Sequence, residues 1–122
     1  MATVMIVDDA AFMRALLKKI VLQCGHNVVA EAGNGDEAIE KFQQYKPDII
    51  LLDIIMPPGG KTKDGIDVLR KIMDIDPAAK VVMCSSMGQQ ALVFEALKLG
   101  AKDFIVKPFQ PQKVMEVLNK WC

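Results

Sequence analysis

Four consecutive large apolar residues, Ile49–Leu52, run directly into an aspartate, Asp53, and lie between Pro47 and Pro57. A short apolar run bounded by turn-forming residues is typical of a strand that is buried on both faces of a parallel sheet. Because Pro57 cannot continue a central strand, the strand must end close to Asp53. A lone aspartate there would be interpreted as a solvated turn residue. A charged carboxylate in a partly dry place costs free energy, however, unless a partner compensates it.

The rest of the chain alternates short apolar runs with segments of helical periodicity. Four more strands are predicted, at Thr3–Val7, Asn27–Glu31, Lys80–Cys84 and Asp103–Val106. Apolar residues recur every three or four positions in five other segments, which begin at Ala10, Asn34, Gly65, Gln89 and Gln112. In the first of these helices, one apolar stripe is expected to face the core; it is formed by Phe12, Leu16 and Ile20 together with Met13, Leu17 and Val21.

Strands that alternate strictly with helices indicate an α/β fold, here a five-stranded doubly wound parallel sheet with helices on both faces. We expect the flavodoxin-like strand order 2-1-3-4-5, which is already known for sheets of this type. The 122 residues suffice for a large core, and no linker or low-complexity tract divides them. A single domain spanning residues 1–122 is therefore expected.

Composition excludes several classes of function. The 15 basic and 15 acidic residues give a net charge of zero and do not cluster, which argues against direct binding of nucleic acid. No apolar run is long enough to span a membrane, and the N-terminus does not resemble a signal peptide. The three cysteines lie far apart without metal-type spacing, so reduced thiols and a cytoplasmic location are expected for Cys24, Cys84 and Cys122.

Polar side chains stand where four of the five predicted strands end. The first strand ends in Asp8 and Asp9, the third in Asp53, the fourth in Ser85 and Ser86, and the fifth in Lys107. In doubly wound sheets, ligands bind outside the carboxyl ends of the strands, at the point where the strand order reverses. The sequence therefore predicts a site at this edge, because solvation alone does not explain so many polar ends on apolar strands.

Three carboxylates at one edge repel one another, and their pKa values would rise unless a cation joined them. Oxygen ligands without nearby histidine or cysteine suit a hard divalent cation, Mg²⁺ before Ca²⁺. Lys107 offers a mobile positive charge and Ser85 a hydroxyl donor for an anionic group. Aspartate carboxylates can accept phosphoryl groups, and phosphoryl transfer needs mainly positioning and charge neutralisation. No residue resembles a strong general base, so a fast hydrolase is not expected.

Two other protein classes with this topology fit the sequence less well. A flavodoxin needs a phosphate loop rich in serine, threonine and glycine after the first strand, but here Asp8 and Asp9 would repel a flavin phosphate. A phosphatase of the haloacid dehalogenase type needs a second aspartate two residues after its nucleophile, and position 55 is Ile55. Neither alternative is retained.

The polar strand ends and their neighbours resemble the receiver domain of two-component response regulators. The resemblance covers the whole chain and rests on five motifs in order: Asp8-Asp9, Asp53 with Met56-Pro57, Asp64-Gly65, Ser85, and Lys107-Pro108. Within that family, three segments look most like a stand-alone chemotaxis regulator: Val7–Arg14, Cys84–Gln90 and Lys107–Pro111.

The resemblance implies a role for each residue at the acidic edge. Asp53 would accept a phosphoryl group from a phosphohistidine of a sensor histidine kinase. Asp9, Asp53 and the backbone carbonyl of Ile55 would ligate Mg²⁺ directly, and Asp8 would act through a water molecule. The protein would then be no classical enzyme but a phosphoacceptor switch, which catalyses only its own phosphorylation and slow dephosphorylation.

The resemblance also implies how the switch is read. Ser85 would hydrogen-bond the phosphoryl group, and Lys107 would form an ion pair with it. The Lys107–Pro108 peptide bond would be cis, and the ring of Phe104 would turn inward. The added charge would shift a two-state equilibrium and change a surface on the fourth helix, fifth strand and fifth helix. The expected partners are the kinase, a flagellar motor switch protein and a phosphatase. A receiver within a multi-domain transcriptional regulator or phosphorelay, or a non-phosphorylated interaction module, is the alternative.

The sequence departs from this family pattern at a few positions. Six residues, Pro58–Lys63, separate Met56-Pro57 from Asp64-Gly65, where typical relatives have a shorter segment. A tolerated surface insertion is the simpler interpretation, because loop closure makes long loops inexpensive. Ile55 and Met87 flank the expected phosphoryl group and are apolar, which predicts slow attack by water. His26, the only histidine, is expected at the surface next to Gly25.

Overall fold

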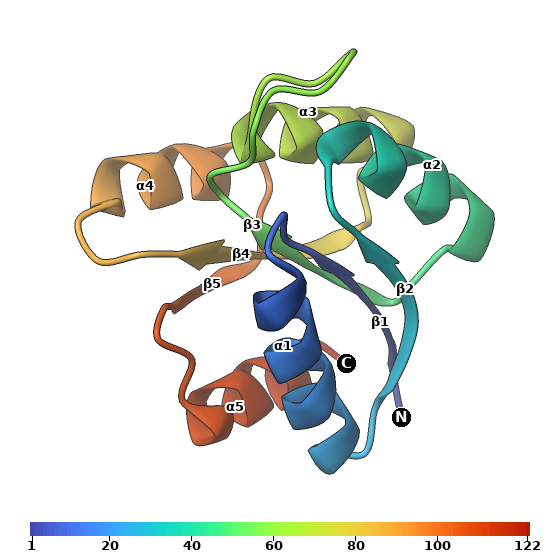
Figure 1. The fold of residues 1–122 in the computed structure, drawn as a ribbon, viewed down its shortest axis with the longest axis vertical. Coiled ribbons are helices and arrows are strands. Elements are labelled where there is room, and N and C mark those ends of the chain that lie inside the picture. The colour runs from blue at the N-terminus through green and yellow to red at the C-terminus, as the bar shows by residue number, and fades with distance from the viewer.

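Five parallel strands form one sheet in the order β2-β1-β3-β4-β5, and the structure, a computed structural model, describes residues 1–122 (Figure 1). The strands are β1 (Thr3–Val7), β2 (Asn27–Ala32), β3 (Ile49–Asp53), β4 (Lys80–Ser85) and β5 (Asp103–Val106). The helices are α1 (Ala11–Gln23), α2 (Gly35–Tyr45), α3 (Gly65–Ile75), α4 (Gln90–Lys98) and α5 (Pro111–Trp121). The predicted fold class and strand order are confirmed.

Helices cover both faces of the sheet, and each face has its own apolar core. Figure 1 shows α2, α3 and α4 on one side and α1 and α5 on the other. Because side chains alternate along a strand, Ile50 and Leu52 of β3 pack towards α2–α4, while Ile49 and Leu51 pack towards α1 and α5. Burial on both faces explains why the central strand reads as a continuous apolar run.

Two helices on the same face begin at side-chain caps. Asn34 accepts a hydrogen bond from the backbone N–H of Glu37 at 2.8 Å and caps α2. Asp64 accepts one from the backbone N–H of Asp67 at 2.9 Å and caps α3. These bonds satisfy backbone donors that the first turn of a helix leaves free. Asp64 therefore ends the long loop after β3 as well as starting α3.

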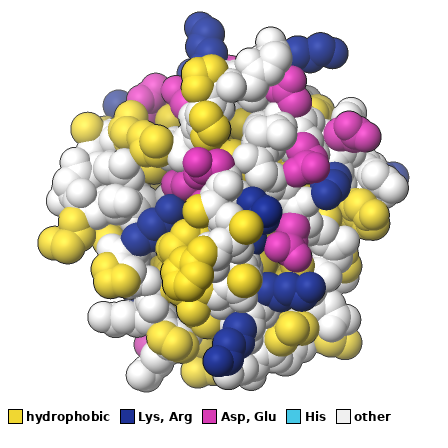
Figure 2. Space-filling view, viewed as in Figure 1, with side chains coloured by type: hydrophobic (Ala, Val, Ile, Leu, Met, Phe, Trp, Pro, Cys, Tyr) yellow, Lys and Arg dark blue, Asp and Glu magenta, His cyan; other side chains and the backbone are white.

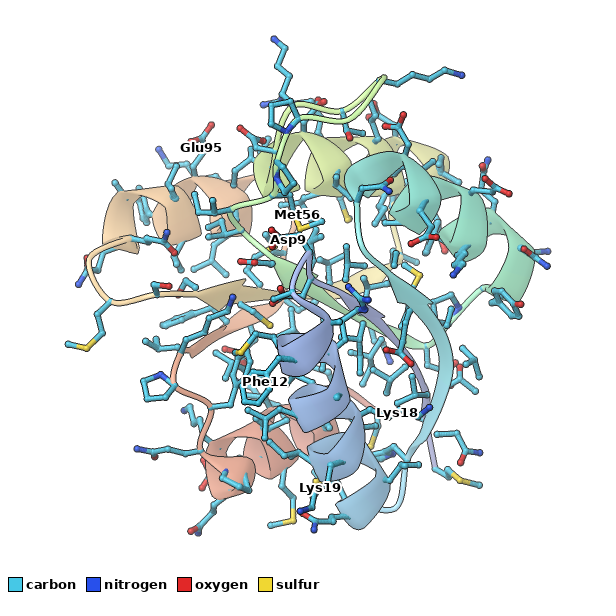
Figure 3. All side chains as sticks on the ribbon, in the orientation of Figure 1. Asp9, Phe12, Lys18, Lys19, Met56 and Glu95 are labelled. Carbon is cyan, nitrogen blue, oxygen red and sulfur yellow. The ribbon has the colours of Figure 1, made fainter.

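One part of the predicted stripe of α1 does not face the core. Ile20 is buried, but the side chain of Phe12 is 76% exposed. Phe12 lies in the first turn of α1, beside the carboxyl ends of the strands, where little of the sheet is available to cover it (Figure 3). The buried residues of α1 are Leu17, Ile20 and Val21, in the second half of the helix.

His26 is buried, so the expectation of a surface histidine is wrong. Its Nδ1 accepts a hydrogen bond from the backbone N–H of Ala2 at 2.9 Å, and its Nε2 lies 3.3 Å from Oδ1 of Asn119. The imidazole therefore joins the start of β1 to the end of α5. The sequence pattern shows only that His26 follows a glycine in a loop, not that the last helix covers that loop.

The remaining differences from the sequence-based bounds are small. β2 extends to Ala32, α4 spans Gln90–Lys98 and α5 begins at Pro111. Pro111 occupies the first turn of α5, where the missing N–H of proline has no cost. The Lys107–Pro108 peptide bond is cis, as expected. None of the helices has both the length and the apolarity needed to cross a membrane.

Candidate functional site

Three aspartates converge at the carboxyl ends of the central strands. Asp8 and Asp9 follow β1, Asp53 is the last residue of β3, and a carboxylate oxygen from each lies within 4.8 Å of the others. The strand order reverses between β1 and β3, so the cluster stands where doubly wound sheets bind ligands. The predicted convergence of these strand ends is confirmed for the three acids.

Lys107 connects two of these acids. Its Nζ lies 3.1 Å from Oδ2 of Asp8 and 3.2 Å from Oδ2 of Asp53. Its own backbone N–H donates to the carbonyl oxygen of Ser85 at 2.6 Å, which continues the pairing of β4 with β5 beyond Val106. The strand pairing therefore places the ammonium group over the aspartates.

Burial makes the electrostatics of the cluster strong. Asp8 is 1% and Asp53 6% exposed, whereas Asp9 is exposed. Burial, together with the charge of Asp8, raises the pKa of Asp53 above its usual value, although Lys107 opposes the shift. Burial lowers the pKa of Lys107, but the two aspartates raise it by more, so the net shift is upward. One ammonium group thus compensates the acids only in part, and a further cation would be favourable.

Close packing holds the backbone around Asp53. The N–H of Ile54 donates to the carbonyl of Cys84 at 2.9 Å, and the N–H of Ile55 donates to Oδ1 of Asp53 at 3.3 Å. A Cβ atom at Gly65 would lie 2.2 Å from the carbonyl oxygen of Asp53 and 2.6 Å from that of Ile54. Only glycine therefore allows the start of α3 to pack against this turn.

An open cavity of about 610 Å³ lies over the acidic cluster. It is lined by Asp9, Asp53, Ile55, Met56, Pro57, Pro58, Ser86, Gln89 and Lys107. Figure 2 shows acidic side chains near the middle of this face with basic and apolar side chains around them, and Figure 3 shows Asp9 next to Met56. The site is therefore open to a ligand of substantial size.

Ser85 and Ile55 lie at different positions relative to this cavity. Ile55 lines it and is 50% exposed, two residues after Asp53. Ser85 is 2% exposed and ends the strand next to β3, but the serine on the cavity wall is Ser86. Gln89 also lines the wall, and its Oε1 accepts the N–H of Ser86 at 2.7 Å. Sequence reasoning missed Gln89, although it lies in the segment that carried part of the family resemblance.

Arg14 is a second residue that sequence reasoning missed. Its guanidinium donates to the backbone carbonyl of Asp8 at 2.6 Å and lies 3.7 Å from the carboxylate of Glu31. These contacts hold the turn that carries Asp8 and Asp9 against the edge strand β2. No local sequence pattern marks such a contact, because Arg14 lies in α1 and Glu31 in β2.

Phe104 lies apart from the acids, beside a second hollow. This hollow, of about 440 Å³, is lined mainly by apolar residues of α4 and β5 and also by Ser85, Ser86 and Phe104. Phe104 is 38% exposed. The structure therefore places the predicted switch aromatic where it shares a wall with the serine at the end of β4.

The geometry defines what this site can do chemically. The three carboxylates can hold a metal ion through oxygen ligands, which a hard divalent cation prefers. Asp53 presents a carboxylate to an open cavity, and Lys107 places a positive charge beside it. A carboxylate nucleophile with a metal and an ammonium group nearby suits phosphoryl transfer.

Several known proteins are similar to this chain in sequence and in fold. Residues 4–119 match the family model described as the response regulator receiver domain. The chain is 59% identical over 117 residues to the chemotaxis protein CheY of Thermotoga maritima, covering 96% of this chain and 94% of that protein. It is 51% identical to CheY of Bacillus subtilis, with the same coverage. A solved CheX-CheY-BeF3-Mg²⁺ complex from Borrelia burgdorferi matches with a TM-score of 0.89 and 39% identity, over 98% of this chain and 89% of that one.

Proposed function

The chain belongs to the response regulator receiver domain family, and from this premise we propose that it is a chemotaxis phosphorylation switch in which Asp53 accepts the phosphoryl group. The observation that carries the proposal is the convergence of Asp8, Asp9 and Asp53 with Lys107 beneath an open cavity. We further propose that residues 1–122 form one receiver domain. The three free cysteines support a cytoplasmic location.

Asp53 is the proposed nucleophile because it is the carboxylate that both lines the cavity and contacts Lys107. A carboxylate oxygen of Asp53 forms a bond to phosphorus while the bond from phosphorus to the imidazole nitrogen of a phosphohistidine breaks. The electron pair of that bond leaves with the nitrogen, which then takes up a proton from solvent. The product is an acyl phosphate on Asp53, and the phosphohistidine belongs to a sensor histidine kinase.

The neighbouring residues stabilise the charge of the transferred group. Lys107 already lies within hydrogen-bonding distance of Asp53 and would pair with a phosphoryl oxygen, and the hydroxyl of Ser85 would donate a second bond. Asp9, Asp53 and the carbonyl of Ile55 would hold Mg²⁺, and Asp8 would act through water. When bound, Mg²⁺ supplies positive charge that neutralises the carboxylates and the phosphoryl oxygens.

The proposed output lies on the far side of Ser85. Movement of Ser85 towards a phosphoryl group would open the hollow that Phe104 borders, so that the ring could turn inward. The surrounding face is apolar, with exposed Phe94, Val106 and Met115 on α4, β5 and α5. We propose that this face binds a flagellar motor switch protein. The matched structure in which CheX accompanies a CheY supports a phosphatase as a further partner.

The test is the intact mass of the protein after incubation with acetyl phosphate, with and without Mg²⁺. The wild type is expected to gain one phosphoryl group only when Mg²⁺ is present, and Asp53→Asn is expected to gain none. The matched control is Asp74→Asn, which removes an exposed carboxylate of α3 and should behave like the wild type. A wild type without an adduct, or an adduct that persists in Asp53→Asn, would contradict the proposal.

A further inference from the structure

The long loop between β3 and α3, residues 57–64, has a defined internal structure. It rises above α3 in Figure 1. Within it, the backbone N–H of Gly59 donates to the carbonyl of Thr62 at 2.7 Å and closes a tight turn. Thr62 is only 4% exposed, although the residues on either side of it, Lys61 and Lys63, are exposed. The burial of Thr62 shows that this part of the loop packs against the rest of the fold.

The carboxylate of Asp36, in the first turn of α2, is the centre around which this turn folds. Oδ1 and Oδ2 of Asp36 lie 3.2 Å and 3.0 Å from the backbone nitrogen of Lys61, which donates to both. The hydroxyl of Thr62 donates to Oδ1 at 3.0 Å. Although partial burial raises the pKa of Asp36, the bonds from Thr62 and Lys61 and the charge of Lys71 together lower it below its usual range. The carboxylate is thus an ionised acceptor for the loop.

Glycines make this close approach possible. A Cβ atom at Gly35 would lie 2.3 Å from the hydroxyl oxygen of Thr62, so any side chain there would push the loop away. At Gly59 and Gly60, a Cβ atom would lie 3.0 Å from a carboxylate oxygen of Asp36. The loop backbone can therefore approach α2 this closely only because these positions lack side chains.

Helix α3 holds the loop from the other side. The Nζ atom of Lys71 donates to the carbonyl of Lys61, and the backbone N–H of Lys63 donates to Oδ2 of Asp67 at 3.0 Å. The tip of the loop is thus bonded to α2 through Asp36 and to α3 through Lys71 and Asp67. Both helices lie on the same face of the sheet, as Figure 1 shows.

Both ends of the loop touch the acidic site. Pro57 and Pro58, at its start, line the cavity together with Asp9 and Asp53, and Ile55 precedes them on the same wall. Directly after the loop, Gly65, the first residue of α3, packs against the carbonyl oxygens of Asp53 and Ile54. Both ends of the loop are therefore continuous with backbone that borders the acidic site.

We propose that Asp36 is a positioning residue for the acidic site: by fixing the loop of residues 57–64, it holds the Ile55 carbonyl and the Pro57–Pro58 wall where a divalent cation can bind. This inference rests on the proposed function, because the cation acts there in phosphorylation. The physical reason is conformational entropy. Each loop residue that becomes free to move gains conformational entropy, which must be lost again whenever the site is assembled.

The first test asks whether Asp36 holds the loop. Trypsin can cleave after Lys61 and Lys63, and both bonds lie in the loop of residues 57–64 that Asp36 contacts. In the absence of metal, Asp36→Ala is expected to be cleaved there about tenfold faster than the wild type, because opening of the loop would no longer break the carboxylate hydrogen bonds. Asp36→Asn keeps one acceptor oxygen and should be intermediate. The control is Glu40→Ala, which removes an exposed carboxylate one turn further along α2.

The second test asks whether the loop acts on the site. The Mg²⁺ concentration that gives half-maximal phosphorylation by acetyl phosphate is expected to rise about three- to tenfold in Asp36→Ala. This change is smaller than the loss of metal affinity that follows removal of a residue hydrogen-bonded directly to a metal ligand. Glu40→Ala should match the wild type. Deleting Gly59–Thr62 removes the segment that Asp36 binds, so adding Asp36→Ala to that deletion should cause no further rise.

The outcomes separate the two proposals. If the wild type forms no Mg²⁺-dependent adduct, the proposed function fails and this inference fails with it. If the wild type forms the adduct but Asp36→Ala has an unchanged Mg²⁺ requirement, only the inference fails. Equal cleavage of Asp36→Ala and wild type by trypsin overturns it as well. The inference also fails if the Mg²⁺ requirement rises by the same amount in Glu40→Ala, or when Asp36→Ala is added to the protein with the shortened loop. Either result would show that charge rather than loop position is responsible.

Discussion

Asp53 carries a charge that the folded protein stabilises only in part. It is 6% exposed, and its pKa is raised by burial and by Asp8 despite the contact with Lys107. A site that binds a cation needs such a deficit, because a fully compensated aspartate would gain little from a metal. The side chain that makes the site reactive should therefore also reduce the stability of the metal-free protein.

Replacement of Asp53 by asparagine is accordingly expected to stabilise the metal-free protein. At pH 7 the free energy of unfolding should rise by about 1 kcal/mol, because a buried charge facing Asp8 is removed while Lys107 keeps its contact with Asp8. The measurement is urea unfolding of both proteins in the presence of a chelator. An Asp53→Asn protein that is less stable than the wild type at pH 7 would contradict this account.

The pH dependence of that difference follows from the direction of the pKa shift. The pKa of Asp53 is higher in the folded state than in the unfolded state, where it is about 3.9. In a window of pH just above the unfolded-state pKa, the folded protein therefore keeps a proton on Asp53 that the unfolded chain has lost. Wild-type stability therefore falls as pH rises through this window. The advantage of Asp53→Asn should shrink as the pH is lowered below about 4, where Asp53 becomes protonated in the unfolded state as well.

Ile55 should limit how fast water removes the phosphoryl group. It is 50% exposed on the cavity wall, two residues after Asp53, and offers no hydrogen bond to an attacking water molecule. Ile55→Asn supplies such a bond, worth about 1 kcal/mol in the transition state, and should speed loss of the phosphoryl group about fivefold. The decay of the phosphorylated mass after removal of acetyl phosphate measures this rate. Slower decay in Ile55→Asn would refute the assignment.

At the scale of elements, the junction between β3 and α3 depends on the absence of a side chain at Gly65. A Cβ atom there would lie 2.2 Å from the carbonyl oxygen of Asp53, a distance that backbone atoms cannot tolerate. The helix start and the strand end must therefore move apart if any larger residue is introduced. Since Asp53 is one of the two residues that must shift, packing of α3 and geometry of the site are coupled.

Gly65→Ala is expected to destabilise the fold by about 3 kcal/mol, at the upper end of what overpacking of a well-packed core costs. Gly88→Ala is the matched comparison, because Gly88 has φ +89° and a Cβ atom there would have no neighbouring atom within 4 Å. Its cost should be the strain of a left-handed alanine alone, about 1 kcal/mol. Denaturant unfolding of both variants measures the difference, and equal losses would contradict a packing origin for Gly65.

At the scale of the whole molecule, ion binding and folding are linked through the strand ends. The acids lie at the carboxyl ends of β1 and β3, which are brought together only by formation of the sheet. An ion that binds these residues in the folded state and not in the unfolded chain must stabilise the fold. The receiver family to which the chain belongs uses Mg²⁺ at an acidic pocket, so this linkage can be measured with Mg²⁺.

Removal of Mg²⁺ should therefore lower the melting temperature of the protein. At a Mg²⁺ concentration ten times the dissociation constant, the stabilisation is about 1.4 kcal/mol. The gain should be greater at pH 8 than at pH 5, because protonation of Asp53, whose pKa is raised, competes with the metal. Thermal unfolding with Mg²⁺ and with chelator measures it, and Asp53→Asn should lose most of the gain. An unchanged gain in that variant would place the ion elsewhere.

The fold class and the convergence of Asp8, Asp9, Asp53 and Lys107 could be predicted from the sequence alone, given the strand order already known for sheets of this type. These predictions succeeded because hydrophobic periodicity and turn residues are local signals, and because parallel strands place all their carboxyl ends at one edge. The proposed roles of Ser85 and Phe104 stay predictions, because they concern the phosphorylated state.

Which side chains the assembled elements cover depends on the packing of the folded protein. Phe12 follows the helical stripe but lies exposed at the end of the sheet, and His26 follows a glycine but is buried against Asn119. The long loop reads as a surface insertion, yet Asp36 holds it through Thr62. Each of these outcomes depends on contacts between segments far apart in the chain. Local periodicity carries no information about such contacts, because they are set by how helices and loops pack on the sheet.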